Sequence, residues 1–264
     1  LSLFMLFVVA IVGFVLAVTV FFKIDTIKAK GSGVYSQKII IENSGVATGD
    51  SLLLVSEKAI SENLFFNLPY VGSVTIEKDL PSTLIINVID TVASAAISNN
   101  KGSYILINDE GKVLNADSKI VTEGIPVVSG VEVESYKVGE TITFKTEETG
   151  DILIQLLKAS TKAGIIGMTE IDLTDVSAIT MKYDNRIKIL VGPAVKLETK
   201  ILRAASAIDR ENEINQYETG VLDLRTDPKV FFKAGLEETT EKNSSNKDKT
   251  KDKNKNKDNK KNET

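Results

Sequence analysis

The chain has 264 residues, with 32 Lys and Arg against 36 Asp and Glu, and it contains neither His nor Cys. The lack of Cys excludes disulfides, thiol nucleophiles and zinc–thiolate sites, and the lack of His excludes His-based triads and histidine metal sites. No G-x-G-x-x-G or Walker pattern occurs, so nucleotide binding has no support and no cofactor is expected.

The first segment, residues 1–22, has no charged residue, and its only polar side chains are Ser2 and Thr19. At 1.5 Å per residue, about 22 helical residues span roughly 33 Å, enough for a hydrocarbon core of about 30 Å. The alternative is a cleaved signal peptide, but its apolar region is usually shorter, and Phe21-Phe22-Lys23 is a poor cleavage site. We therefore expect an uncleaved transmembrane helix over 1–22. The lysines that follow leave its orientation open, because the other flank is not in the sequence.

A small folded module is expected over residues 23–91. Ser56 is placed to cap a helix that Pro69 ends, because proline removes a hydrogen-bond donor and restricts the residue before it. The predicted elements are a strand over 24–29, a helix between Ser36 and Gly45, a helix over 56–67, and strands over 71–76 and 84–88. The order is strand, helix, helix, strand, strand.

A larger mixed β-sheet module with helices is expected over residues 92–234. Its clearest helix has Thr146 as the expected cap and an apolar stripe along one side. The predicted elements are a hairpin over 104–114 turning at 109–111, a strand over 125–130, a helix over 147–161, strands over 168–173, 178–183 and 187–191, a helix over 195–208, and strands over 221–225 and 229–232. The fold class is therefore α+β.

The C-terminal tail, residues 235–264, is dominated by Lys, Asn and Asp. Such a segment cannot bury enough apolar surface to offset its chain entropy, so we expect it to be disordered. A solvated extension is favoured over contact with an anionic polymer or lipid. Nucleic acid is not an expected partner, because the folded part is acidic and the basic tail lacks aromatic residues.

Two patterns could suggest an enzyme. Ser98 and Lys101 match the S-x-x-K pattern of serine penicillin-binding enzymes, but they lie in a polar stretch beside Gly102, and no KTG or SDN partner motif is present. Asp172 and Asp175 could form a carboxylate pair, but they flank the end of a predicted strand, where Asp is common in turns. We expect no catalytic activity and no small-molecule substrate.

The strongest candidate for a functional site is the last predicted strand. A terminal strand followed only by a disordered tail is expected to be a sheet edge, which can receive a partner strand by β-augmentation. Alternatively, Val230 and Phe232 are core residues flanked by solubilising lysines, and both interpretations can hold because alternate side chains face opposite ways. The candidate residues are Lys229, Val230, Phe231, Phe232 and Lys233, with Val221, Asp223 and Arg225 on the supporting strand.

Several fragments in order resemble the FtsQ/DivIB family of bacterial cell-division proteins, in which a POTRA domain follows a transmembrane helix and precedes a β domain. They are Phe22–Ile27 with Gly31, Ser44-Gly45 with Gly49, Leu68–Val71, Leu80–Leu84, the Asp109–Leu114 hairpin, Ile125–Gly130 and Val221–Arg225. One departure is Thr91 after Asp90, where relatives often carry Arg or Lys.

The resemblance implies a single-pass protein of the cell membrane at the division septum, with its C-terminal region outside the cytoplasm. It implies a non-enzymatic scaffold that binds coiled-coil division proteins of the FtsB/DivIC and FtsL type and, through them, regulates septal peptidoglycan synthesis proteins. In the family, the closing strands of the β domain receive the FtsB/DivIC-type partner. The alternatives are a POTRA docking module of a secretion or membrane-assembly system and a membrane-anchored cell-wall enzyme.

Overall fold

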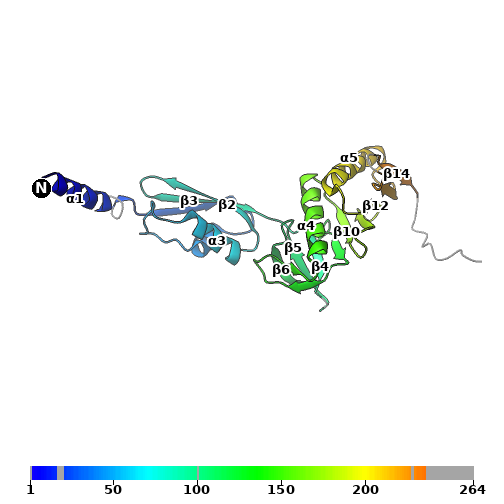
Figure 1. Ribbon diagram of the computed structural model, residues 1–264, viewed down its shortest axis with the longest axis horizontal. Coiled ribbons are helices and arrows are strands. Elements are labelled where there is room, and N and C mark those ends of the chain that lie inside the picture. Colours follow the sequence, from blue (N-terminus) through cyan, green and yellow to red (C-terminus); the bar gives the residue numbers. More distant parts are fainter. Residues whose placement is uncertain (1, 17–20, 100, 227–228, 236–264) are drawn as a thin grey trace, which may run out of the picture.

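The computed structural model describes residues 2–16, 21–99, 101–226 and 229–235. It is elongated: a lone helix, α1 (Ser2–Leu16), stands at one end, followed by a small three-stranded sheet with two helices and then a larger sheet with two long helices (Figure 1). The fold is mixed α+β, as predicted.

Helix α1 lies within the predicted membrane segment, and its large apolar side chains are exposed. The predicted span of 1–22 also includes residues 1 and 17–20, which lie outside the described residues. Within the described ranges, no helix combines the length and the apolar character required to cross a bilayer. The tail predicted to be disordered lies outside the described residues, apart from Gly235.

The small domain has the predicted order of elements. Ser36 and Ser56 cap the two helices through their side-chain oxygens, which accept from the N–H groups of Ile39 and Ala59, and Gly45 ends α2 in the left-handed conformation. Strand β3 is central, parallel to β1 and antiparallel to β2, and the helices cover one face. The elements are β1 (Thr26–Lys30), α2 (Gln37–Ser44), α3 (Glu57–Asn67), β2 (Val71–Asp79) and β3 (Thr83–Asp90).

The large domain is built on a nine-stranded sheet with the order β14-β13-β12-β11-β10-β7-β4-β5-β6, and its core lies between this sheet and helices α4 and α5. A two-stranded ribbon, β8–β9, lies apart from it. The elements are β4 (Ala95–Ser98), β5 (Tyr104–Ile107), β6 (Val113–Ser118), β7 (Val127–Ser129), β8 (Val133–Ser135), β9 (Thr143–Phe144), α4 (Glu147–Lys162), β10 (Met168–Asp172), β11 (Ile179–Tyr183), β12 (Ile187–Gly192), α5 (Leu197–Asn215), β13 (Gly220–Asp223) and β14 (Phe231–Ala234).

Both long helices differ from the prediction in detail. Thr146 precedes α4 but makes no side-chain cap. Helix α5 begins two residues later than predicted and extends to Asn215, beyond the expected end at Ile208. The apolar stripe stops at Ile208, but the polar last turns are held by side chains, since Arg186 donates to Asn212 and Asn212 donates to the Tyr183 hydroxyl at 3.1 Å. Tertiary hydrogen bonds therefore extend a helix that periodicity alone ends early.

The two domains are joined by direct contacts as well as by the connecting chain. Lys112, at the start of β6, donates from Nζ to the backbone oxygen of Val71 at 2.9 Å, and its ammonium lies 5.1 Å from the centre of the Phe65 ring. Asn108 donates to the Thr91 hydroxyl at 3.2 Å. Partial burial at this junction lowers the pKa of Lys112 to about 8.

Candidate functional site

Strand β14 is one outer strand of the large sheet. It runs antiparallel to β13, with Val221 opposite Lys233, Leu222 opposite Phe232 and Asp223 opposite Phe231. Within the described residues, no other strand pairs with its far side. The strand predicted over 229–232 is displaced, because β14 begins at Phe231 and Lys229 and Val230 precede it. The Lys229 N–H donates to the Thr226 oxygen at 2.8 Å.

The two phenylalanines of β14 point to opposite faces of the sheet, because successive side chains of a strand alternate in direction. Phe232 points to the helix-covered side and packs with Val230 against the hydrophobic core. Phe231 points to the opposite, open face of the sheet and is 46% exposed. Of the predicted contact residues, Phe231, Lys229 and Lys233 are thus accessible, whereas Phe232 and Val230 are partly used by the core.

The backbone groups of β14 that face away from the sheet can be assigned from neighbouring hydrogen bonds. On the side of β12, the N–H groups of Gly220 and Leu224 donate to the backbone oxygens of Arg186 and Leu190. On the side of β14, the Thr219 oxygen accepts the Gly235 N–H at 2.8 Å. Because bonding alternates along an antiparallel pair, the odd-numbered residues of β13 bond to β14. Phe232 and Ala234 therefore direct their N–H and C=O groups outward, in the geometry that strand addition requires.

Gly220 permits the close approach of β14 to β13. A Cβ atom at this position would lie 2.5 Å from the Lys233 oxygen and 2.7 Å from the edge of the Phe232 ring. Both contacts would be clashes, and they could be relieved only if β14 moved away from β13. The position of β14 in the sheet therefore depends on the absence of a side chain at residue 220.

Asp223 and Arg225 form a two-pronged ion pair beside the edge. Nε of Arg225 lies 2.9 Å from Oδ1 of Asp223, and Nη2 lies 2.7 Å from Oδ2. These hydrogen bonds lower the pKa of the Asp223 carboxyl and raise that of the Arg225 guanidinium. Strand β13 ends at Asp223, so Arg225 lies just beyond the strand rather than within it.

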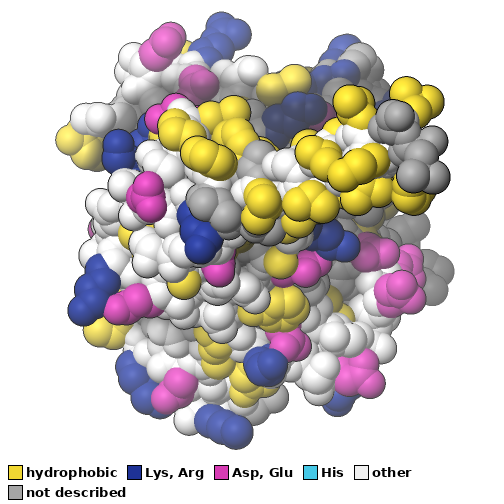
Figure 2. Space-filling view, turned by 90° about the vertical axis from the view of Figure 1, so that its left-hand side faces the viewer, with side chains coloured by type: hydrophobic (Ala, Val, Ile, Leu, Met, Phe, Trp, Pro, Cys, Tyr) yellow, Lys and Arg dark blue, Asp and Glu magenta, His cyan; other side chains and the backbone are white. Residues whose placement is uncertain are grey.

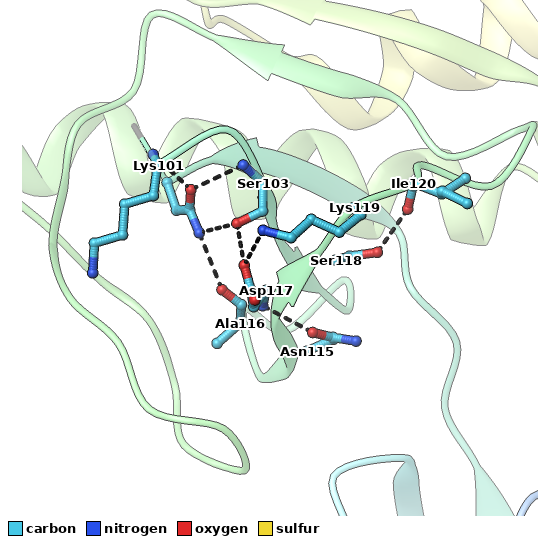
Figure 3. A network of polar contacts seen from close by, with 9 residues as sticks. Lys101, Ser103, Asn115, Ala116, Asp117, Ser118, Lys119 and Ile120 are labelled. Atoms are coloured by element: carbon cyan, nitrogen blue, oxygen red, sulfur yellow. Dashed lines mark hydrogen bonds and ion pairs between the residues drawn. The ribbon is translucent and has the colours of Figure 1, made fainter.

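The S-x-x-K pattern does not form a catalytic arrangement. Ser98 ends strand β4 and Lys101 lies on the turn to β5, so the two residues are not one turn apart on a helix as that chemistry requires. Ser103 and Lys119 converge on Asp117, while the Lys101 side chain points away from them (Figure 3). The polar network therefore holds a hairpin together.

The second catalytic candidate is likewise explained by turns. The Asp172 carboxylate accepts from the Ser129 hydroxyl at 3.2 Å and from the Thr174 N–H at 2.9 Å, and the bonds from Thr174 lower its pKa. Ser177 lowers the pKa of Asp175 in the same way. A general acid–base pair requires two carboxyl groups whose pKa values are pushed apart, and both of these are lowered. Among the residues described, no cluster of three potential metal ligands occurs.

The domain junction was not predicted from the sequence. Residues 109–111 were correctly expected to form a turn, but the sequence gives no signal that Lys112 reaches Val71 or that Gly139 lies against α3. Gly139 has a φ of +87°, and a Cβ there would lie 2.6 Å from the Phe66 oxygen. A glycine in a polar loop was the only available indication of this close approach.

Comparison with known families first defines the class of the protein. Residues 22–89 match the family model described as POTRA domain, FtsQ-type, and residues 95–225 match the model described as cell division protein FtsQ/DivIB, C-terminal. The candidate strand β14 follows the second match. The chain belongs to the FtsQ/DivIB family of cell-division proteins, which supports a role as a division scaffold.

Similar proteins match most of the chain. The cell division protein DivIB of Clostridium tetani is 25% identical over 220 residues, covering 81% of this chain and 80% of the relative. DivIB of Clostridium botulinum strain Hall is 28% identical over 217 residues, covering 80% and 82%. The cell division protein FtsQ of Corynebacterium glutamicum is 25% identical over 209 residues, covering 78% and 87%.

Proposed function

We propose that this chain is a non-enzymatic division scaffold whose strand β14 receives an extended segment of a coiled-coil division protein of the FtsB/DivIC type. The observation that supports this most directly is the outward-facing backbone of Phe232 and Ala234 on an outer strand. The exposed ring of Phe231 offers an apolar contact beside that backbone. Main-chain pairing supplies affinity in such a complex, and alternate side chains supply specificity.

The proposal includes membrane anchoring and a place in the division machinery. Residues 1–22 anchor the chain as a single transmembrane helix, and the folded region of residues 23–91 and 92–234 lies outside the cytoplasm at the septum. The uncharged sequence of 1–22 and the exposed apolar surface of α1 support the anchor. FtsL-type proteins and septal peptidoglycan synthesis proteins are then engaged through the coiled-coil partner.

A substitution that removes one backbone N–H of β14 tests whether its free edge binds the partner. Proline at residue 234 removes the outward N–H and places a ring on the free side, while the inward bonds of Lys233 to Val221 remain. We expect Ala234→Pro to weaken partner binding at least about tenfold, which corresponds to about 1.4 kcal/mol. Ala234→Ser, which keeps the N–H, should bind like the wild type.

The measurement is capture of membrane proteins by the purified full chain in detergent, with the captured proteins identified by mass spectrometry and their binding titrated. Recovery of small single-pass coiled-coil proteins by the wild type and Ala234→Ser, but not by Ala234→Pro, supports the proposal. Equal recovery by all three forms removes β14 as the site. Recovery of secretion or assembly components in their place would favour the alternative POTRA docking module.

A further inference from the structure

The end of the small domain nearest α1 carries a group of exposed apolar side chains from three separate segments. Phe21, directly before the domain, is 74% exposed; Leu53 and Leu54, in the loop before α3, are 41% and 73% exposed; and Leu80, in the β2–β3 turn, is 58% exposed. We call these four residues the proximal cluster. Single exposed apolar residues are common, but a group at one end of a domain indicates a contact surface.

Hydrogen bonds hold the three segments at the same end. The Leu52 N–H donates to the Phe22 oxygen at 2.7 Å, which joins the loop to the entering chain. The Asp25 N–H donates to the Ser82 oxygen at 2.9 Å, which joins the entering chain to the β2–β3 turn. Figure 1 shows this turn at the end of the sheet nearest α1. Figure 2 views the molecule from the α1 end, so the exposed apolar side chains of α1 lie in front of the small domain in that picture.

The exposure of Leu54 is a fixed feature of its loop. The N–H groups of Leu54 and Val55 both donate to the Ser51 oxygen at 3.1 Å, and Lys78 Nζ donates to the Val55 oxygen at the same distance. The neighbouring Leu52 is fully buried. The fold therefore buries one leucine of this loop and directs the next two outward, although it has a core that could accept apolar side chains.

We propose that the proximal cluster lies in the headgroup region of the bilayer, so that the small domain rests on the lipid surface. This inference rests on the proposed anchoring of residues 1–22. Five residue steps separate Leu16 from Phe21, and an extended chain advances at most about 3.6 Å per step, so Phe21 lies within about 18 Å of the end of α1. The hydrogen bonds from Leu52 to Phe22 and from Asp25 to Ser82 keep the rest of the cluster at the same end of the domain. A bilayer anchored that close is the surface that the cluster meets.

Charged neighbours set the depth of this contact. Lys23 and Asp25 follow Phe21 in the chain, and Asp79 precedes Leu80. Charged groups are costly in hydrocarbon but not among headgroups, so the apolar side chains enter only the interfacial layer. The mixed signs of these charges indicate that zwitterionic lipid is sufficient for the contact.

The lack of native cysteine allows a direct test with single-cysteine variants of the full chain, each labelled with the environment-sensitive dye NBD. Leu54→Cys reports the cluster, Val9→Cys reports the proposed anchor, and Ile120→Cys, 77% exposed in the large domain, is the control for a solvated label. Each protein is reconstituted in phosphatidylcholine vesicles that contain nitroxide lipids with the spin label either shallow or deep in the bilayer.

We expect a blue shift and quenching by shallow nitroxide for the Leu54 label, quenching by deep nitroxide for the Val9 label, and neither for the Ile120 label. Adding Phe21→Asp and Leu80→Asp should abolish the Leu54 signal without changing the melting temperature, because these side chains are exposed. If the Val9 label is quenched but the Leu54 label matches that of Ile120, the inference is overturned and the anchor stands. If the Val9 label is not quenched, the proposed anchor itself is wrong.

Discussion

The two outer strands of the nine-stranded sheet, β6 and β14, meet their surroundings differently. Along β6, the Val113 N–H donates to the Glu140 oxygen at 2.9 Å, and the Val113 oxygen accepts the Gly139 N–H at 2.8 Å. Beyond β14 no further strand is paired within the described residues, and the backbone N–H and C=O groups of Phe232 and Ala234 face outward.

This comparison indicates why one edge is a candidate site and the other is not. An uncovered edge is an aggregation hazard that proteins usually cover, charge or shorten. The chain covers β6 with its own loop at residues 139–141, and the same loop lies against α3 of the small domain. Strand β14 is short, contains Lys233 and follows Lys229, which limits unspecific pairing but leaves its backbone available to a matching strand.

The largest expected effect comes from opening the covered edge. Gly139→Val forces a β-branched residue to a φ of +87° and places its Cβ 2.6 Å from the Phe66 oxygen. We expect the free energy of unfolding to fall by about 2–4 kcal/mol, because a left-handed conformation and a backbone clash are combined. Gly164→Val, with a φ of +71° and open space around the site, carries only the first cost. Chemical denaturation measures both variants. If Gly139→Val and Gly164→Val lose the same free energy of unfolding, the contact of the 139–141 loop with α3 does not contribute to stability.

A smaller loss is expected at the open edge. Gly220→Ala should lower the free energy of unfolding by about 1–3 kcal/mol, because β14 must move away from β13 to admit the methyl group. It should also weaken partner binding. The matched control is Gly33→Ala, where the nearest atom to a new Cβ, Asp90 Oδ2, is 3.8 Å away. If hydrogen exchange at β14 is unchanged in Gly220→Ala, the close approach does not matter.

The two phenylalanines of β14 should separate stability from binding. Phe232→Ala removes a ring packed against the core and should cost about 1–3 kcal/mol of unfolding free energy, less than for a fully buried ring. Phe231→Ala should change stability by under about 0.5 kcal/mol and act on partner affinity. Thermal melts and binding titrations on both variants test this, and the reverse pattern would show that the faces are misassigned.

The last expected effect is a pH dependence at the domain junction, and it is small because Lys112 is only half-buried and solvent screens much of its charge. The pKa of Lys112 is lowered to about 8 in the folded protein, against about 10.5 when unfolded, so the folded state releases this proton first. Stability should therefore rise with pH between about 8 and 10.5, as the cost of burying the charge is removed. Lys112→Met should lack this rise when unfolding is followed by denaturant titration across that range. If the wild type instead lost stability relative to Lys112→Met over this pH range, the pKa of Lys112 would be raised by folding and not lowered.

The sequence predicted elements well where the signals were local. Ser36 with Gly45 and Ser56 with Pro69 delimit the two small helices, because caps and breakers act on the residues beside them. The alternating roles of Phe231 and Phe232 were likewise one of the expected outcomes for a strand. These signals act within a few residues, which is why they can be read directly from the chain.

Contacts between distant segments were not predictable in this way. The order of the nine strands and the hydrogen bond from Lys112 to Val71 depend on pairings across the chain that no local pattern specifies. Helix α5 continues to Asn215 because Arg186 and Tyr183 hold Asn212, partners that lie 26 and 29 residues away. The apolar stripe therefore marked the buried part of this helix and missed its hydrogen-bonded end.

The junction between the domains also has a consequence for the proposed arrangement of the protein on a membrane. Since Lys112 and Gly139 fix the small domain to the large one, bending at the connecting chain is resisted, and β14 is held at the end of the molecule opposite α1 (Figure 1). Under the proposed anchoring and docking, β14 would stand at a set height over the lipid. A coiled coil rising from the same bilayer advances about 1.5 Å per residue, so this height would select partners by their length.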